Sequence, residues 1–337
     1  MKERGFSLVE LIIALGVSAV VLAMAVGVFQ RQERSYAVQN EITERQQNVR
    51  VALDMLTRDL RMAGYATGFQ ANPAVDLDGD GANDSVIINA VDNIGPAADD
   101  VADGTDVVTI VYGRLPHELR SGPPATASAE YVQGTNIVLA SCDLDGDGFD
   151  DLTDAGGVPA MPLGVVYDLS KGAAFRVTAR AGNTLTVSPN LGNWPVGAYV
   201  CPLNVVRYWI DNENTQGAQD ALDPVMPRLM RQNLGRDLGP ETVAENITDL
   251  QLQYGLDRNH DGQIDADGWV NDFTVATDRP QDAVAVRVWV MGRNPTPRPG
   301  YVDQVAAGTT MGNVAVGAAP LYARQILETE VRLRNRR

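Results

Sequence analysis

An uncharged apolar run near the start of the chain limits the folds open to this sequence more than any other feature. From Leu11 to Phe29 every residue is apolar or small, and Ser18 carries the only hydroxyl. As a helix, Phe6 to Phe29 would reach about 36 Å, enough to cross a bilayer with some tilt. One ionisable residue, Glu10, lies at its start. Because a carboxylate in hydrocarbon costs about 2.5–3.5 kcal/mol, we predict a function for Glu10 there.

The residues that open this run, Arg4-Gly5-Phe6-Ser7-Leu8-Val9-Glu10, closely resemble the N-terminal signature of type IV pilins and type II secretion pseudopilins. The resemblance implies a leader peptide at residues 1–5, cleaved between Gly5 and Phe6 by a membrane prepilin peptidase that also methylates the new amine. It implies that Glu10 pairs with the Phe6 ammonium of a neighbouring subunit during assembly. Other minor and major pilins and an inner-membrane assembly platform are the further partners that it implies.

Two simpler interpretations of the run explain less. A secretory signal peptide has an apolar core of about 7–15 residues followed by a small-residue cleavage site, whereas this run is longer and lacks such a site. A plain membrane anchor explains neither Glu10 nor the Gly5–Phe6 junction. Lys2 and Arg4 precede the run, and basic residues stay on the cytoplasmic side. We therefore expect a single-pass inner-membrane protein with its later residues in the periplasm, which the resemblance places in a pilus at the cell surface.

A polar helical pattern follows, from Gln30 to about Met62. It contains neither Gly nor Pro, and Gly64 is expected to end it. Charged side chains, including Arg45, surround an apolar stripe at helical spacing. The stripe consists of Ile42, Val49, Leu53, Leu56 and Leu60. We expect it to pack under a head domain, and a separate coiled coil is the alternative.

Residues 63–337 are predicted to form a β-rich head, because short apolar runs alternate with Gly, Pro, Asn and Asp. Segments 113–130 and 292–320 are expected to be loops, and Gly182-Asn183 to be a hairpin turn. The predicted strands are 85–89, 106–112, 135–140, 164–168, 174–179, 184–188, 204–210, 250–254, 283–291 and 326–333. The fold class is therefore α+β, pilin-like: a long N-terminal helix, transmembrane over 6–29 and amphipathic over 30–62, packed on a mainly antiparallel β domain.

Five short segments in about the last 130 residues resemble, in order, PilW-type minor pilins and, more distantly, the J-type pseudopilin of type II secretion. They are Val206–Ile210, Pro227–Arg231, Asn246–Tyr254, Ala285–Val290 and Val331–Asn335. The resemblance implies a minor pilin that helps to initiate or cap a pilus. A J-like pseudopilin is one alternative. A pilus-tip adhesin is another, supported by the long middle segment with its acidic loops.

Three acidic loops share one pattern of oxygen-bearing side chains. Each has Asp or Asn at positions 1, 3, 5 and 9 and Gly at position 6, as a calcium loop requires. The side chains are Asp76, Asp78, Asp80 and Asp84 in the first loop, Asp143, Asp145, Asp147 and Asp151 in the second, and Asp257, Asn259, Asp261 and Asp265 in the third.

The loops depart from the full EF-hand pattern at position 12, where a bidentate Glu is expected. The second loop has Asp154 there and resembles dockerin-type loops, whereas the first has Ile87 and the third has Gly268, next to Asp267. The repeated pattern predicts bound Ca²⁺ in at least one loop, with the second and third favoured. Ordinary solvated Asp-Gly turns are the alternative.

The chain contains two cysteines, Cys142 and Cys201. In an exported domain we expect them to form one disulfide, which would stabilise the fold by about 4 kcal/mol on the chain-entropy model. It would also fix the start of the second acidic loop, because Cys142 directly precedes Asp143. Two buried thiols are the alternative.

Charge and motif content exclude several function classes. A net charge of −16 argues against binding to a nucleic-acid backbone, which needs clustered Lys and Arg. The only two histidines are His117, in a segment predicted to be a loop, and His260, inside the third acidic loop. Neither lies near a nucleophile signature, and phosphate-binding and zinc motifs are missing from the sequence. We therefore do not expect an enzyme.

Overall fold

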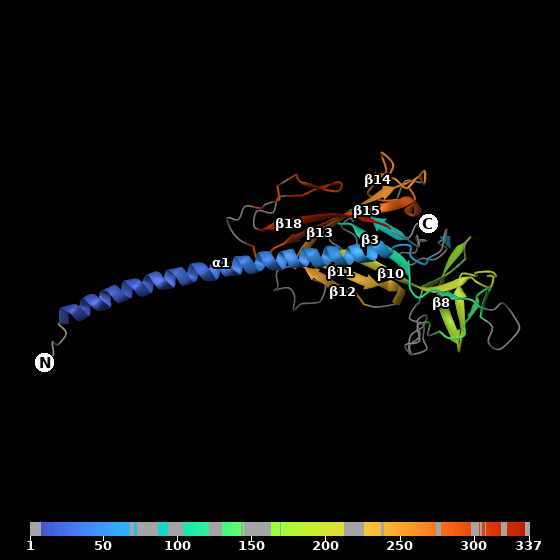
Figure 1. Cartoon of the computed structure of the whole chain (residues 1–337), viewed down its shortest axis with the longest axis horizontal. Helices are drawn as coiled ribbons and strands as arrows, with labels where there is room; N and C mark the ends of the chain where they lie inside the picture. Colours follow the sequence, from blue (N-terminus) through green and yellow to red (C-terminus); the bar gives the residue numbers. More distant parts are fainter. Residues whose placement is uncertain are drawn as a thin grey trace.

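The computed structural model describes residues 8–67, 71–72, 87–93, 104–120, 130–142, 144, 163–168, 170–211, 226–236, 239–273, 278–297, 303, 305–306, 308–317 and 322–333. A single long helix, α1 (Leu8–Met62), runs into a β-rich head, and its N-terminal half projects away from that head (Figure 1). The predicted α+β class, a long helix packed on a mainly antiparallel β domain, is confirmed.

The C-terminal half of α1 is held by the apolar stripe that the sequence predicts. Val49, Leu56 and Leu60 are fully buried, and Leu53 packs against the same cluster. Ile42 is the exception, because 38% of it is exposed. The helix ends before Gly64, whose φ of +73° suits a residue without a Cβ.

Strand β10 (Tyr199–Asp211) is the central strand of the largest sheet. Its first residues pair with β7, and its later ones pair with β3 and β11, all antiparallel. The strands follow the order β12 (Glu241–Glu245), β11 (Arg228–Asn233), β10, β7 (Leu163–Tyr167), β8 (Gly172–Ala181), β9 (Thr184–Ser188), β6 (Asn136–Val138) and β5 (Tyr131–Gln133). Off this path lie β1 (Ala71–Asn72) on β8, β3 (Val107–Gly113) and β4 (His117–Glu118) on β10, and β2 (Ile88–Val91) on β3.

A second, fully antiparallel sheet covers the other side of the core. Its order is β14 (Trp269–Val270), β13 (Ile247–Leu256), β15 (Ala283–Arg293) and β18 (Arg324–Arg332). A small hairpin, β16 (Thr310–Met311) and β17 (Val314–Ala315), forms its own two-stranded sheet. The 3₁₀ turns η2 (Leu234–Arg236) and η3 (Pro280–Asp282) complete the described elements.

The main core lies where α1 meets both sheets. Side chains alternate along each strand, so every second residue faces the helix. Leu250 and Leu252 of β13 and Val206 of β10 belong to one buried cluster with the helix residues Val49 and Leu56. Trp289 and Met291 occupy the alternate positions of β15 and face away from the helix. Met311 of the β16–β17 hairpin packs against them there. The sheets therefore clamp the end of α1 from two sides.

A second lobe, consisting of β5 to β9 with the start of β10, has a hydrophobic core of its own. Phe175, Ile137 and Leu185 are fully buried in it. It lies at the end of the molecule farthest from the N-terminus of α1 (Figure 1). We call it the distal lobe.

Each predicted strand overlaps an observed one, and the predicted hairpin turn joins β8 to β9, with Gly182 at a φ of +60°. The sequence patterns missed the polar strands β11 and β12 and six short strands of two or three residues, β1, β4, β5, β14, β16 and β17. Two of the short elements, β4 and the β16–β17 hairpin, lie in segments predicted to be loops.

Candidate functional site

The N-terminal half of α1 is an exposed apolar surface. Every large apolar side chain from Leu8 to Phe29 is at least 53% exposed. Within the described residues, α1 is the one helix whose length and composition would let it span a membrane, and its most apolar 18-residue window is 0% buried with a mean hydropathy of 2.7. An apolar surface of this size requires lipid or other helices to cover it.

Glu10 lies in the first turn of α1, exposed among these apolar side chains. No other charged residue occurs between Leu8 and Phe29. The N-terminal end of a helix favours a negative charge, which the carboxylate of Glu10 supplies. The predicted cleavage residues Gly5 and Phe6 lie outside the described residues.

The third acidic loop is the one calcium-type loop that the structure describes. Asp257 is 4% exposed, and its carboxylate accepts hydrogen bonds from the backbone N–H groups of Asp261 (3.0 Å) and Gly262 (2.8 Å). Asn259 Oδ1 accepts the Asp261 N–H at 2.9 Å, and Asp261 Oδ1 accepts that of Gln263 at 2.8 Å. Gly262, at position 6, has a φ of +85°. The side chains at positions 1, 3 and 5 are therefore held in a tight turn by the loop's own backbone.

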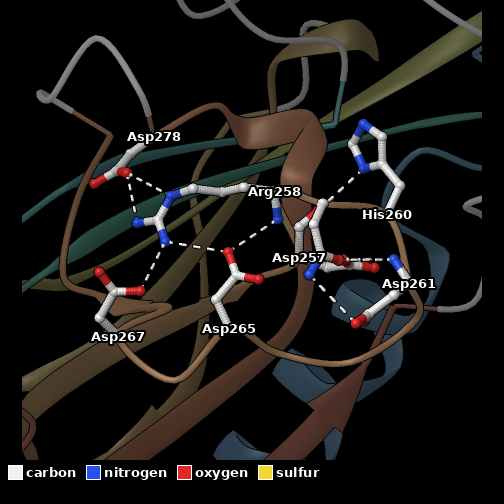
Figure 2. A network of polar contacts seen from close by, with 8 residues as sticks. Asp257, Arg258, His260, Asp261, Asp265, Asp267 and Asp278 are labelled. Atoms are coloured by element: carbon white, nitrogen blue, oxygen red, sulfur yellow. Dashed lines mark hydrogen bonds and ion pairs between the residues drawn. The ribbon is translucent and has the colours of Figure 1, made fainter.

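Arg258 supplies a cation to the acids around this loop (Figure 2). Its guanidinium donates to Asp278 at 2.7 Å, to Asp265 at 3.3 Å and, more loosely, to Asp267 at 3.5 Å. The hydrogen bond with Asp278, reinforced by the other carboxylates, raises the pKa of Arg258, so the side chain keeps its charge. The predicted ligand at position 9, Asp265, is therefore turned toward Arg258.

The loop fits a calcium ion in part. Asp257, Asn259 and Asp261 offer the hard oxygen donors that calcium prefers, whereas Asp265 is hydrogen-bonded to Arg258. In the described part of the chain, no three His, Cys, Asp or Glu side chains gather closely enough to hold a metal ion. The ligands predicted in the other two loops, Asp76, Asp78, Asp80 and Asp84, and Asp143, Asp145, Asp147, Asp151 and Asp154, lie outside the described residues.

The predicted disulfide between Cys142 and Cys201 is not formed, and both residues are buried thiols. They pack in different clusters: Cys142 in the core of the distal lobe, and Cys201 of β10 with apolar residues of β3, β7 and β8. Cys201 Sγ donates to the carbonyl of Arg114 at 3.1 Å, and burial raises its pKa to about 12. The prediction assumed that an exported chain pairs its cysteines, but the two side chains are directed into separate cores.

A buried polar network that the sequence analysis missed joins α1 to the head. Asp59 is 6% exposed and accepts hydrogen bonds from the Tyr208 hydroxyl at 2.7 Å and from Arg231 Nε at 3.1 Å. Tyr112 donates a weaker one at 3.4 Å. Burial, and then the charge of Asp59, raises the pKa of Tyr112 to about 12, so it stays protonated as a donor. The sequence did contain one indication that Asp59 is buried: it follows Leu56 of the apolar stripe by three residues and so lies on the same face of the helix.

Two buried acids lie where β3 and β13 approach one another. Burial raises the pKa of Asp106 to about 7, although its carboxylate accepts the backbone N–H groups of Asn93 (3.0 Å) and Leu252 (2.6 Å). Burial likewise raises the pKa of Asp249 to about 6. Both carboxylates are therefore partly protonated in mildly acidic solution.

The two histidines have local partners. His117 Nε2 lies 2.9 Å from Glu130 Oε1, and Glu130 also accepts the backbone N–H groups of Arg120 and Ala140. Burial would raise the pKa of Glu130, but these hydrogen bonds outweigh it and lower that pKa. His260 Nδ1 lies 3.0 Å from the carbonyl oxygen of Asp257. These contacts are local and consistent with structural roles.

Comparison with known families finds two matches. Residues 1–26 match the family described as Prokaryotic N-terminal methylation motif, and residues 207–335 match the family described as Type IV Pilus-assembly protein W. No curated protein and no solved structure matches the chain. The two resemblances predicted from sequence are thus confirmed, each at the residues that carried it. They indicate a minor type IV pilin role in pilus assembly, and the two families are structural rather than enzymatic.

Proposed function

We propose that this chain is a minor pilin that helps to initiate or cap a type IV pilus. The observation that carries the proposal is the apolar half of α1, exposed along its whole length and continuous with the half clamped in the head. A rigid connection of this kind lets the head follow any movement of the helix. Prepilin peptidase, other pilins and the inner-membrane assembly platform are the partners in this proposal.

In this mechanism the apolar helix moves laterally from the bilayer into a bundle of similar helices. Glu10 pairs there with the N-terminal ammonium of a neighbouring subunit, created by cleavage between Gly5 and Phe6. Either charge alone in hydrocarbon is strongly unfavourable, so the pair forms only when the helices are in register. The same pair therefore supports both association and alignment.

Piliation of cells that lack the chain, complemented with variants, tests the proposal. Glu10→Ala is expected to leave the protein in the membrane while surface pili are lost. Glu33→Ala, an exposed acid beyond the apolar run of the same helix, is the matched control and is expected to restore pili. Normal piliation with Glu10→Ala would contradict the proposal. Intact pili together with a secretion defect in the deletion strain would favour the J-like pseudopilin instead.

Calcium in the acidic loops is a further part of the proposal, as a stabiliser of the head. In the third loop, Asp257, Asn259 and Asp261 would hold the ion, and Asp265 would join them on leaving Arg258. The support is the loop's turn geometry and its repeated ligand pattern, which occurs three times in the sequence. Bound calcium would neutralise carboxylates that otherwise repel one another.

One observation favours a second candidate, a pilus-tip adhesin. The distal lobe has its own core and lies at the end of the head farthest from the membrane helix (Figure 1). At a filament tip, that end would face outward. Cells lacking the chain separate the two functions, because pili without adherence would favour the adhesin, whereas loss of pili would favour assembly.

A further inference from the structure

An open cavity of about 470 Å³ lies beside α1, lined by residues of the helix and of β18 and by Val305, Ala306 and Thr309. Its described lining combines basic, amide and apolar side chains: Arg45, Gln46, Val305, Thr309, Arg324 and Gln325, among others. The volume is that of a site for a small molecule. It lies apart from the third acidic loop and from the Asp59 network, whose residues do not line it.

Arg45 is the unusual member of this lining. The sequence pattern places it among the charged side chains around the stripe, yet it is only 6% exposed. It precedes Val49 by four residues and so lies on the buried face of the helix. Within the described residues, its Nε and Nη1 atoms are buried without a hydrogen-bond partner. Two buried guanidinium N–H groups without an acceptor are unfavourable, so the position suits a ligand that accepts hydrogen bonds.

The carboxylates near Arg45 are engaged elsewhere. Glu41, one turn earlier, accepts hydrogen bonds from Thr296 Oγ1 at 2.8 Å and from Asn294 Nδ2 at 3.4 Å. Asp303 pairs with the second arginine of the cavity, Arg324, whose Nε donates to it at 2.7 Å. Arg324 is thus paired within the chain, whereas Nε and Nη1 of Arg45 have no acceptor among the described residues.

We propose that this cavity binds a small molecule through an oxyanionic group, a carboxylate or a phosphate, held by Arg45. Its unpartnered Nε–H and Nη1–H groups can each donate a charge-assisted hydrogen bond to an oxyanion. The buried Gln325 Oε1 also lacks a partner among the described residues, and its amide can turn to present either an acceptor or a donor to the ligand. Val305 and Ile326 line the cavity and would contact the ligand's apolar part.

A lipid headgroup is a poor candidate for this ligand. Arg45 follows Phe29, the end of the apolar run, by 16 residues. At about 1.5 Å per residue, this places it roughly 24 Å farther along the helix axis, beyond the headgroup region if the run spans a bilayer. The ligand is therefore expected to reach the cavity from the aqueous side.

Calorimetric titration of the purified full chain in detergent micelles, at constant ionic strength, tests the proposal. The probes are inorganic phosphate, hexanoate and, as an uncharged analogue of hexanoate, hexan-1-ol. At least one anion is expected to bind, and hexan-1-ol is expected to bind more weakly. Binding of phosphate alone would assign a phosphate-bearing ligand, and binding of hexanoate alone a carboxylate.

Arg45→Gln is expected to weaken anion binding about tenfold or more, since a hydrogen bond to a charged group contributes on that scale. Arg50→Gln, at an exposed site on the same helix, is the matched control and is expected to bind like the parent. Arg45→Lys keeps the charge but not the planar fork and is expected to be intermediate; it also tests the proposal if Arg45→Gln fails to fold. Absence of anion binding to the parent, equal binding of hexan-1-ol, or undiminished binding by these Arg45 variants would overturn the proposal.

Discussion

The carboxylate of Asp59 on α1 and the hydroxyl of Tyr208 on β10 form a hydrogen bond of 2.7 Å across 149 residues of sequence. Arg231 of β11 donates to the same oxygen of Asp59 at 3.1 Å and to Glu241 of β12 at 2.8 Å. Three consecutive strands of the sheet are thus tied to one side chain of the helix. The network therefore adds directional hydrogen bonds to the apolar contacts between α1 and the sheet.

Replacement of Asp59 by Ala is expected to destabilise the head by about 1–3 kcal/mol, because Tyr208 loses its acceptor in a buried site while Arg231 keeps Glu241. Urea unfolding of the full chain in micelles measures the change. Asp54→Ala removes an exposed acid from the same helix and is expected to change stability by less than about 0.5 kcal/mol. Equal effects of the two substitutions would show that the network adds nothing.

Gly292→Ala is expected to cost about 1–3 kcal/mol through overpacking. A Cβ at this position of β15 would collide with Cγ2 of Val49 on α1, so the helix would have to move away from the sheet. The Val49→Ala background should recover part of that loss, which a double-mutant cycle of unfolding free energies measures. Gly317→Ala, where a Cβ meets nothing within 4 Å, is the control. Additive effects of the Gly292 and Val49 changes would contradict the contact.

The contribution of Asp106 and Asp249 to the free energy of unfolding is expected to fall as pH rises from about 4 to about 7. Each binds its proton more tightly when folded, with pKa values raised from 3.8 to about 7 and about 6. The folded state therefore holds more protons, and its advantage is complete below about pH 4 and is lost as pH passes the folded values. Between pH 6 and 7 the contribution of Asp106 predominates.

Asp106→Asn mimics the protonated carboxyl and is expected to flatten the dependence of melting temperature on pH, most clearly between pH 6 and 7. Asp54→Asn changes the same charge at an exposed position and should leave the slope as it is. A slope unchanged by Asp106→Asn would mean that this carboxylate does not titrate in that range.

Calcium is expected to raise the melting temperature of the full chain, and chelator to lower it. At a concentration about a hundredfold above the dissociation constant, one site contributes about 2.7 kcal/mol. Asp257→Asn should remove the third loop's contribution to the calcium-dependent rise in melting temperature, and Asp54→Asn is the control. If the melting temperature of the parent is the same in calcium and in chelator, the structural ion is excluded.

Arg258→Gln separates the third loop from the other two. Without the guanidinium, Asp265 is released, so this variant should melt below the parent in chelator but gain more from added calcium. A calcium response identical to that of the parent would show that Arg258 and the ion do not compete for Asp265.

The sequence predicted most helices and strands, because an element with one buried face has apolar residues at a regular spacing. The helix end at Gly64, the hairpin at Gly182 and strand β9 follow from local chemistry. Strand β11 was not among the predicted strands, because its Arg and Gln side chains are typical of an exposed segment. Its strand conformation depends on pairing with β10 and β12. The cysteine pairing failed for a similar reason, since composition carries no information on which core each thiol enters.

The linear sequence was sufficient for the membrane-type helix, its single acid and the cleavage motif, because these depend on hydrophobicity and spacing within about 30 neighbouring residues. The repeated Asp and Asn spacing of the acidic loops is also a property of the sequence alone. The partners of Asp59, the cation that Arg258 places on Asp265 and the burial of Arg45 emerged only after folding. Each of these depends on segments distant in the chain, whose meeting is fixed by how the two sheets close around the helix, and no local spacing encodes that closure.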